Sequence, residues 1–287
     1  PPHLQQQPVT RDSSLRLVGS EMCIRDSATT TTSSGDTTTT TTAPENPALN
    51  IDPTAAVATD LAGFLAQPTA CGSDAPEPAQ DLSFTAPEDL GLGTDPITVT
   101  IVTSCGDIVI EMDPAVAPET VNSFVFLAQE GFFDGTVSHR VVPDFVIQAG
   151  DPTATGSGSP GYRIPDEPPT EGFRYARGVV AMANAGAGTT GSQFFIMTSD
   201  ANLPPLYSVF GTVIEGYDVI DAINILPKGV SARGEPSVPL ETLYIEQVIV
   251  DLCFLVSRRC HQTRENVSGR TAPASRLNSP RPSAVSS

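Results

Sequence analysis

One arginine in a largely apolar stretch is the residue of this sequence best suited to chemistry. Arg140 lies in SHRVVPDFVIQAGD (138–151), directly after His139. A guanidinium is permanently charged and carries five N–H donors in a planar fork. In apolar surroundings such a group can stabilise an electron pair that develops during a reaction, without covalent chemistry. An arginine beside a histidine is more often a solvated surface pair, so these two residues alone do not indicate a site.

Two further stretches supply small, polar and aromatic residues that could complete a site. They are GVVAMANAGAGTTGSQFFI (178–196) and LPPLYSVFG (203–211). Successive residues of a strand point to opposite faces, so Phe194 and Phe195 cannot both be core residues of one sheet. Alternation alone does not say which of the two belongs to the site.

In order and spacing, the three stretches and the elements before them resemble the cyclophilin family over about residues 97–251. The resemblance implies a mainly β fold, a closed eight-stranded antiparallel barrel capped by two α-helices. It also implies peptidyl-prolyl cis/trans isomerase activity without a cofactor, with Arg140 as the catalytic residue and Phe195 against the proline ring. The substrate-binding residues that it implies are His139, Phe145, Val146, Gln148, Ala183, Asn184, Gln193, Phe195, Leu203 and Tyr207.

Isomerisation about an X-Pro bond would explain why these residue types occur together. Twisting the amide breaks its resonance and leaves a lone pair on the proline nitrogen, to which Arg140 could donate. Apolar neighbours would hold the ring, and Gln148 would fix the guanidinium. Val146 stands where the family often has Met, and Leu203 where it often has Trp or Phe, so we expect only weak binding of cyclosporin-like inhibitors.

Three other interpretations have to be compared with this one. His139, Asp151 and Ser192 occur in the order used by one class of serine protease, although Ser192 lies in no recognisable nucleophile loop. A non-catalytic proline-binding module or chaperone would present nearly the same apolar site, and the arginine argues against it. A metal site is not expected, because the three histidines lie far apart and show no ligand spacing with cysteines.

The elements that must position these residues are mostly short strands. ITVTIVT (97–103) and DIVIEM (107–112) alternate apolar and polar residues around a Ser-Cys-Gly turn, which predicts a half-buried hairpin. PETVNSFVFLAQ (118–129) has an apolar stripe at helical spacing, Pro at its start and Gly131 after its end, which predicts a helix. A second helix fits residues 217–223. The many short strands after residue 138 favour a closed antiparallel barrel.

Composition divides the chain into four parts. Residues 1–27 are interpreted as an artefact or leader remnant, because SSLRLVGSEMCIRDS (13–27) resembles translated sequencing adapter. Residues 28–65 are predicted to be a disordered linker, since ten of the 14 residues at 29–42 are threonine; apolar residues within 48–66 also allow a short helix. Residues 66–251 form the predicted isomerase domain. Residues 252–287, with six arginines and one acid, are predicted to be a disordered basic tail.

Charge and cysteine content suggest partners and a compartment. A net charge of −18 argues against nucleic acid as a partner. The resemblance implies proline-containing polypeptides as substrates, and we expect a monomer. Outside the flanks, Cys71 and Cys105 remain as an even pair, and a disulfide between them would require an oxidising compartment. With the threonine-rich tract, this predicts an extracytoplasmic protein whose signal or anchor is not in this chain.

Overall fold

Alternating apolar residues build the first hairpin of the fold. In the computed structural model, which describes residues 50–251, strand β2 (Ile97–Thr103) pairs with β3 (Gly106–Met112). Their registers run from Ile97 opposite Met112 to Thr103 opposite Gly106. One side chain in two is buried along β2, as the sequence pattern predicts.

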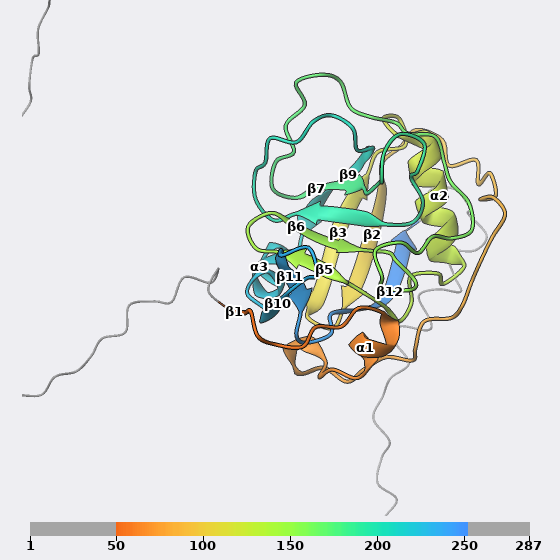
Figure 1. The fold of residues 1–287 in the computed structure, drawn as a ribbon. Helices are drawn as coiled ribbons and strands as arrows, with labels where there is room; N and C mark the ends of the chain where they lie inside the picture. The colour runs from red at the N-terminus through yellow and green to blue at the C-terminus, as the bar shows by residue number, and fades with distance from the viewer. Residues whose placement is uncertain (1–49, 252–287) are drawn as a thin grey trace, which may run out of the picture. The chain divides into compact units, whose positions relative to one another are not determined.

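The hairpin belongs to a nine-stranded sheet that curls around a core (Figure 1). The strand order is β4-β12-β2-β3-β9-β7-β8-β6-β5. The remaining members are β4 (Thr136–Val137), β5 (Arg140–Val142), β6 (Val146–Ala149), β7 (Val179–Met182), β8 (Phe194–Met197), β9 (Val209–Glu215) and β12 (Tyr244–Asp251). Every pairing in this sheet is antiparallel.

The two end strands of this order are neighbours in the chain, and this closes the sheet. Only Ser138 and His139 separate β4 from β5. The backbone N–H of Ser138 donates to the Leu243 carbonyl at 2.8 Å, and its hydroxyl donates to the Gln148 carbonyl at 2.8 Å. The predicted mainly β, barrel-like fold is confirmed. The count of eight is only approximate, because one strand is interrupted and the structure has nine.

Two helices cover the barrel at the predicted places. Helix α2 (Pro118–Gln129) contacts β12, and α3 (Tyr217–Asn224) contacts β3 and β5 on another side of the barrel (Figure 1). The carboxylate of Glu167 accepts from the backbone N–H groups of Glu119 and Thr120 at 3.1 and 2.8 Å. This anion at the N-terminus of α2 satisfies donors that the helix itself cannot.

Aromatic rings fill the barrel interior. The Phe124 ring of α2 lies 4.9 Å from the Phe133 ring and 5.4 Å from that of Phe194. A cavity of about 20 Å³ remains beside Phe194, lined mainly by apolar side chains. That space is enough for about one water molecule and too small for a ligand, so chemistry has to take place outside the barrel.

Residues 50–65 are folded, which corrects the predicted linker boundary at residue 66. Strand β1 (Ile51–Asp52) pairs in parallel with β10 (Lys228–Val230), which pairs with β11 (Pro236–Pro239) in a second, three-stranded sheet. Helix α1 (Leu61–Leu65) buries Phe64 in a cluster that includes Val137 and Tyr244. The short helix allowed by the sequence is therefore present, and it packs on the barrel. The predictions for residues 1–49 and 252–287 lie outside the described residues.

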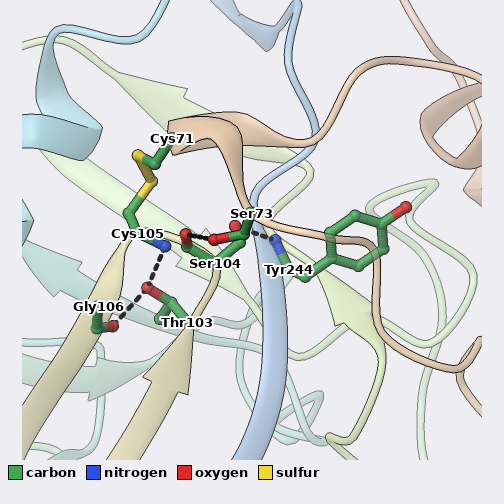
Figure 2. Close-up of a disulfide and its surroundings, with 7 residues drawn as sticks. All are labelled: Cys71, Ser73, Thr103, Ser104, Cys105, Gly106 and Tyr244. Atoms are coloured by element: carbon green, nitrogen blue, oxygen red, sulfur yellow. Dashed lines mark hydrogen bonds between the residues drawn. A yellow bond between two sulfur atoms is a disulfide. The ribbon is translucent and has the colours of Figure 1, made fainter. Parts of the chain in front are cut away.

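A disulfide fastens the N-terminal segment to the first hairpin (Figure 2). Cys71 lies in a 3₁₀ turn (η2, Ala70–Gly72), and its Cα atom is 5.1 Å from that of Cys105 in the β2–β3 turn. Beside the bond, the Ser73 hydroxyl donates to the Ser104 carbonyl at 2.5 Å, and the Cys105 N–H donates to the Thr103 hydroxyl at 3.1 Å. The cysteine pair expected from the sequence is thus joined in this structure.

Replacing both cysteines by serine should lower the free energy of unfolding by about 2–4 kcal/mol, because the unfolded chain regains the freedom of the closed loop. The two cysteines are 34 residues apart. Urea denaturation of the oxidised wild type and of the double variant measures the difference. Equal midpoints with equal slopes would contradict it.

The single lysine of the sequence is buried where α3 meets β10. Lys228 is 1% exposed, and its Nζ donates to the carbonyls of Asn224 and Leu226 at 2.8 and 2.6 Å. These carbonyls lie at and just beyond the end of α3, where the helix provides no donor. Burial lowers the pKa of Lys228 to about 8, although the Asp144 carboxylate opposes the shift.

Above pH 8, Lys228→Met should cost about 1–3 kcal/mol of stability, since two buried carbonyls lose their donor. Between pH 8 and 10 the wild type should gain further on the variant, because the unfolded lysine keeps a proton that the folded one has released. The gain is limited to about 1.4 kcal/mol per pH unit. Urea denaturation of both proteins across this range measures it, and a difference that does not change with pH would contradict the assignment.

Candidate active site

Strand register places three of the predicted site residues in one row. Arg140 of β5 lies opposite Gln148 of β6, which lies opposite Phe195 of β8. Residues paired in this way share a face of the sheet. Their chain neighbours Val141, Ile147, Phe194 and Ile196 are buried in the barrel core. The row therefore lies on the outer face of the sheet, and Phe194 and Phe195 separate as alternation requires.

A second group of apolar side chains surrounds Phe195, and we call it the outer apolar cluster. Its buried members are Val146, Tyr175, Val179, Ala181, Phe195 and Met197, and the partly buried ones are Val142, Phe145, Phe173, Ala183, Ala201, Leu203, Tyr207 and Val209. The Phe195 and Tyr207 rings meet edge to face with centroids 5.5 Å apart. Six residues predicted from the sequence thus gather here, namely Phe145, Val146, Ala183, Phe195, Leu203 and Tyr207.

A chain of hydrogen bonds leads from Arg140 into the protein. Its Nη1 donates to Gln148 Oε1 at 3.1 Å, and Gln148 Nε2 donates to Gln193 Oε1 at 3.0 Å. Gln193 Nε2 in turn donates to the Gly158 carbonyl at 3.0 Å and lies 3.4 Å from Asp151 Oδ2. The expected contact between Gln148 and Arg140 is present, and Gln193 fixes the Gln148 amide.

Asp151 anchors the far end of this chain. Its carboxylate is fully buried and accepts from the backbone N–H groups of Thr153 and Gly158 at 2.7 and 3.1 Å. Buried charge is tolerated when it is hydrogen-bonded in this way. The residue thus organises the loop after β6.

The strongest contact of Arg140 was not predicted from the sequence. Glu235 accepts from Arg140 Nε at 2.8 Å and from Nη2 at 2.7 Å. The two side chains are 30% and 36% exposed, and the hydrogen bonds from Arg140 are the main reason why the pKa of Glu235 lies below its ordinary value. The residue precedes β11, 95 positions after Arg140, in a turn that resembles any polar loop.

The segment after β7 is tied to both sides of the outer apolar cluster. The backbone N–H of Ala183 donates to the Gln193 carbonyl at 2.9 Å. Asn184 Nδ2 donates to the Leu206 carbonyl at 2.9 Å. A substrate that pairs with this segment would therefore have to use backbone groups other than the N–H of Ala183.

His139 lies away from the outer apolar cluster, beside the loop that Asp151 organises. A Cβ at Gly156 would come within 3.9 Å of its Nε2, and among the described residues its buried Nδ1 has no hydrogen-bond partner. Burial lowers the pKa of His139, and Arg140 lowers it further, whereas Asp151 raises it. The imidazole is therefore neutral at pH 7. The resemblance implies that His139 binds substrate, but the structure places its ring beside this loop and not in the outer apolar cluster.

We expect one histidine resonance of the full chain to titrate with a midpoint below about 6.5, the ordinary value. Carbon-detected NMR between pH 4 and 8 would resolve it, and its absence from a His139→Gln spectrum would assign it to His139. A midpoint at or above the ordinary value would show that Asp151, rather than burial, dominates.

Ser192 is placed too deeply for a nucleophile. It is 1% exposed, and its hydroxyl donates to the Gly150 carbonyl at 2.7 Å. A nucleophilic serine would instead donate to a histidine base, as in a catalytic triad. The serine hydrolase interpretation therefore has no geometric support. Within residues 50–251 there is also no group of three or more His, Cys, Asp or Glu residues that could hold a metal.

Comparison with known proteins gives a consistent set of similarities. The profile of the cyclophilin type peptidyl-prolyl cis-trans isomerase/CLD family matches residues 98–249. The chain is 41% identical over 175 residues to the probable peptidyl-prolyl cis-trans isomerase B of Mycobacterium tuberculosis, a match that covers 55% of this chain and 56% of that protein. The chain thus matches little more than half the length of that relative.

Shorter relatives are matched over nearly their full length. Peptidyl-prolyl cis-trans isomerase ppi1 of Schizosaccharomyces pombe is 39% identical over 155 residues, which cover 53% of this chain and 97% of that protein. Isomerase B of Streptomyces anulatus is 41% identical over 171 residues, covering 53% and 95%. The residues matched by the family profile, 98–249, include the row of Arg140, Gln148 and Phe195.

Proposed function

This chain belongs to the cyclophilin-type peptidyl-prolyl cis-trans isomerase family, and from that premise we propose that it accelerates rotation about X-Pro peptide bonds. Its substrates would be proline-containing polypeptides, and its role would be to assist their folding. The observation that carries the proposal is the row in which Arg140 and Gln148 stand beside Phe195 on one face of the sheet.

The chemistry asks the protein to favour a twisted amide over both planar forms. Rotation costs about 18–20 kcal/mol because resonance gives the C–N bond double-bond character. In the twisted state the proline nitrogen becomes pyramidal and can accept a hydrogen bond. A donor that meets this lone pair, and cannot meet it in the planar amide, lowers the barrier and not merely the binding energy.

Arg140 is the donor in this proposal, and the outer apolar cluster holds the ring. Phe195 and Val146 would pack on the pyrrolidine, with Phe145, Leu203 and Tyr207 at the rim. With a substrate bound, these side chains and the proline ring would exclude water from the donor, which would strengthen its hydrogen bond. The chain of amides behind Arg140 holds Nη1 of the guanidinium, which limits the reorganisation needed during rotation.

Arg140→Ala should reduce kcat/KM for a proline tetrapeptide by about 10²-fold, the usual loss when a preorganised donor is removed. A protease-coupled assay of the full chain measures the rate, and thermal unfolding checks that the variant is folded. Unchanged activity in a folded Arg140→Ala protein would refute the mechanism.

The wild-type and Arg140→Ala proteins also distinguish the enzyme from the alternative, a binding module or chaperone without catalysis. A binding module would retain peptide in a titration and give the spontaneous isomerisation rate with wild-type protein. The bidentate anchoring of the guanidinium favours the enzyme, because a module that only binds proline needs no fixed donor.

Weak inhibitor binding and an extracytoplasmic setting are each supported by one feature of the chain. Val146 and Leu203 offer less surface than the larger residues common in the family, which supports weak binding of cyclosporin-like inhibitors by a monomer. The Cys71–Cys105 disulfide supports an oxidising, extracytoplasmic setting. None of the helices within residues 50–251 has the length and apolar character needed to cross a membrane.

A further inference from the structure

The carboxylate of Glu235 binds the guanidinium of Arg140 along one edge. Nε and Nη2 form two parallel hydrogen bonds to its oxygens, while Nη1 is held by Gln148 from another direction. We propose that Glu235 is a positioning residue of the isomerase, which fixes the plane of Arg140 for the transition state. The inference rests on the proposed function, since it assigns a part to Glu235 in the same reaction.

A single contact could not fix the guanidinium. Gln148 binds only Nη1, so with that bond alone the planar group could still swing about its own side chain. A fork bound at two donors along one edge cannot turn without breaking both bonds. These contacts use three of the five N–H donors and leave two for a substrate, so Glu235 need not move away for catalysis.

Glu235 is itself held in a tight turn between β10 and β11. Its carbonyl accepts from the N–H of Ser231 at 2.8 Å, and the N–H of Gly234 donates to the Ser231 carbonyl at 2.9 Å. Strand β11 contacts β5, which carries Arg140. Strand β1 extends the same small sheet at its other edge, with Ile51 opposite Lys228. The carboxylate is therefore presented by hydrogen-bonded backbone.

Exposure separates a positioning role from a structural one. Both side chains are about one-third exposed, and ion pairs in such surroundings contribute little to stability because water screens them. Removing the charge at position 235 should thus leave unfolding nearly unchanged. The orientation of the donor is more sensitive, because a displacement of about 1 Å can cost about 10²-fold in rate.

The test compares Glu235→Gln with wild type and with Glu111→Gln, the same change at an exposed position on β3. An uncoupled cis/trans assay over a range of peptide concentrations gives kcat and KM separately. We expect kcat to fall about tenfold with KM nearly unchanged in Glu235→Gln, and neither to change in Glu111→Gln. Glu235→Asp, which keeps the charge on a shorter side chain, should recover part of kcat.

A spectroscopic signature accompanies the kinetics. The Nε–H resonance of Arg140, assigned by its absence in Arg140→Ala, should be protected from exchange in wild type and exchange faster in Glu235→Gln. Wild-type kcat in folded Glu235→Gln overturns the inference, as does an equal loss of residual activity when Glu235→Gln is added to Arg140→Ala. Full activity of Arg140→Ala itself would instead overturn the proposed function.

Discussion

The structure depends on holding the permanent positive charge of Arg140 at the edge of an apolar surface, although water would solvate that charge more strongly. Arg140 meets this constraint with hydrogen bonds on two sides, to the amide of Gln148 and to the carboxylate of Glu235. Each partner comes from a different part of the chain. The closed sheet, the β10–β11 hairpin and the buried Asp151 together bring these partners to one place.

The closed sheet makes this possible by separating two groups of apolar residues with one set of strands. Along β5, β6 and β8, one side chain in two points into the barrel and joins the aromatic core, while the others point outward to the row of Arg140, Gln148 and Phe195. Because the core is close-packed, the backbone beneath the outer row has little freedom to move. The site thus gains its precision from packing on the opposite face of the same strands.

Local patterns predicted the parts of the fold that local physics decides. The alternation of residues 97–103 and the apolar stripe of 118–129 place the first hairpin and α2 correctly, because each follows from burial of one face. The same alternation separates Phe194 from Phe195 without saying which is inside. That choice depends on how the sheet closes, and the resemblance to a family supplied it.

Local sequence patterns could not predict contacts between segments that are far apart in the chain. Glu235 meets Arg140 only because the β10–β11 hairpin returns to β5, and nothing in Gly-Glu-Pro-Ser marks that return. The apolar residues within 50–65 allowed a short helix but did not show what it would pack against, and Phe64 finds Val137 and Tyr244 on a surface built by other strands. The break between β4 and β5 is likewise set by the closure of the sheet, so the count of eight strands missed it.

The position of Lys228 has a consequence for how the protein meets reactive molecules. It is the single ε-amine of the sequence, and the fold keeps it almost entirely from solvent with both neighbouring carbonyls as acceptors. Acylating agents and reducing sugars, which attack exposed neutral amines, therefore find no lysine to modify while the corner of α3 and β10 stays closed. The rate at which such a reagent modifies Lys228 would therefore measure how often the structure opens where α3 meets β10.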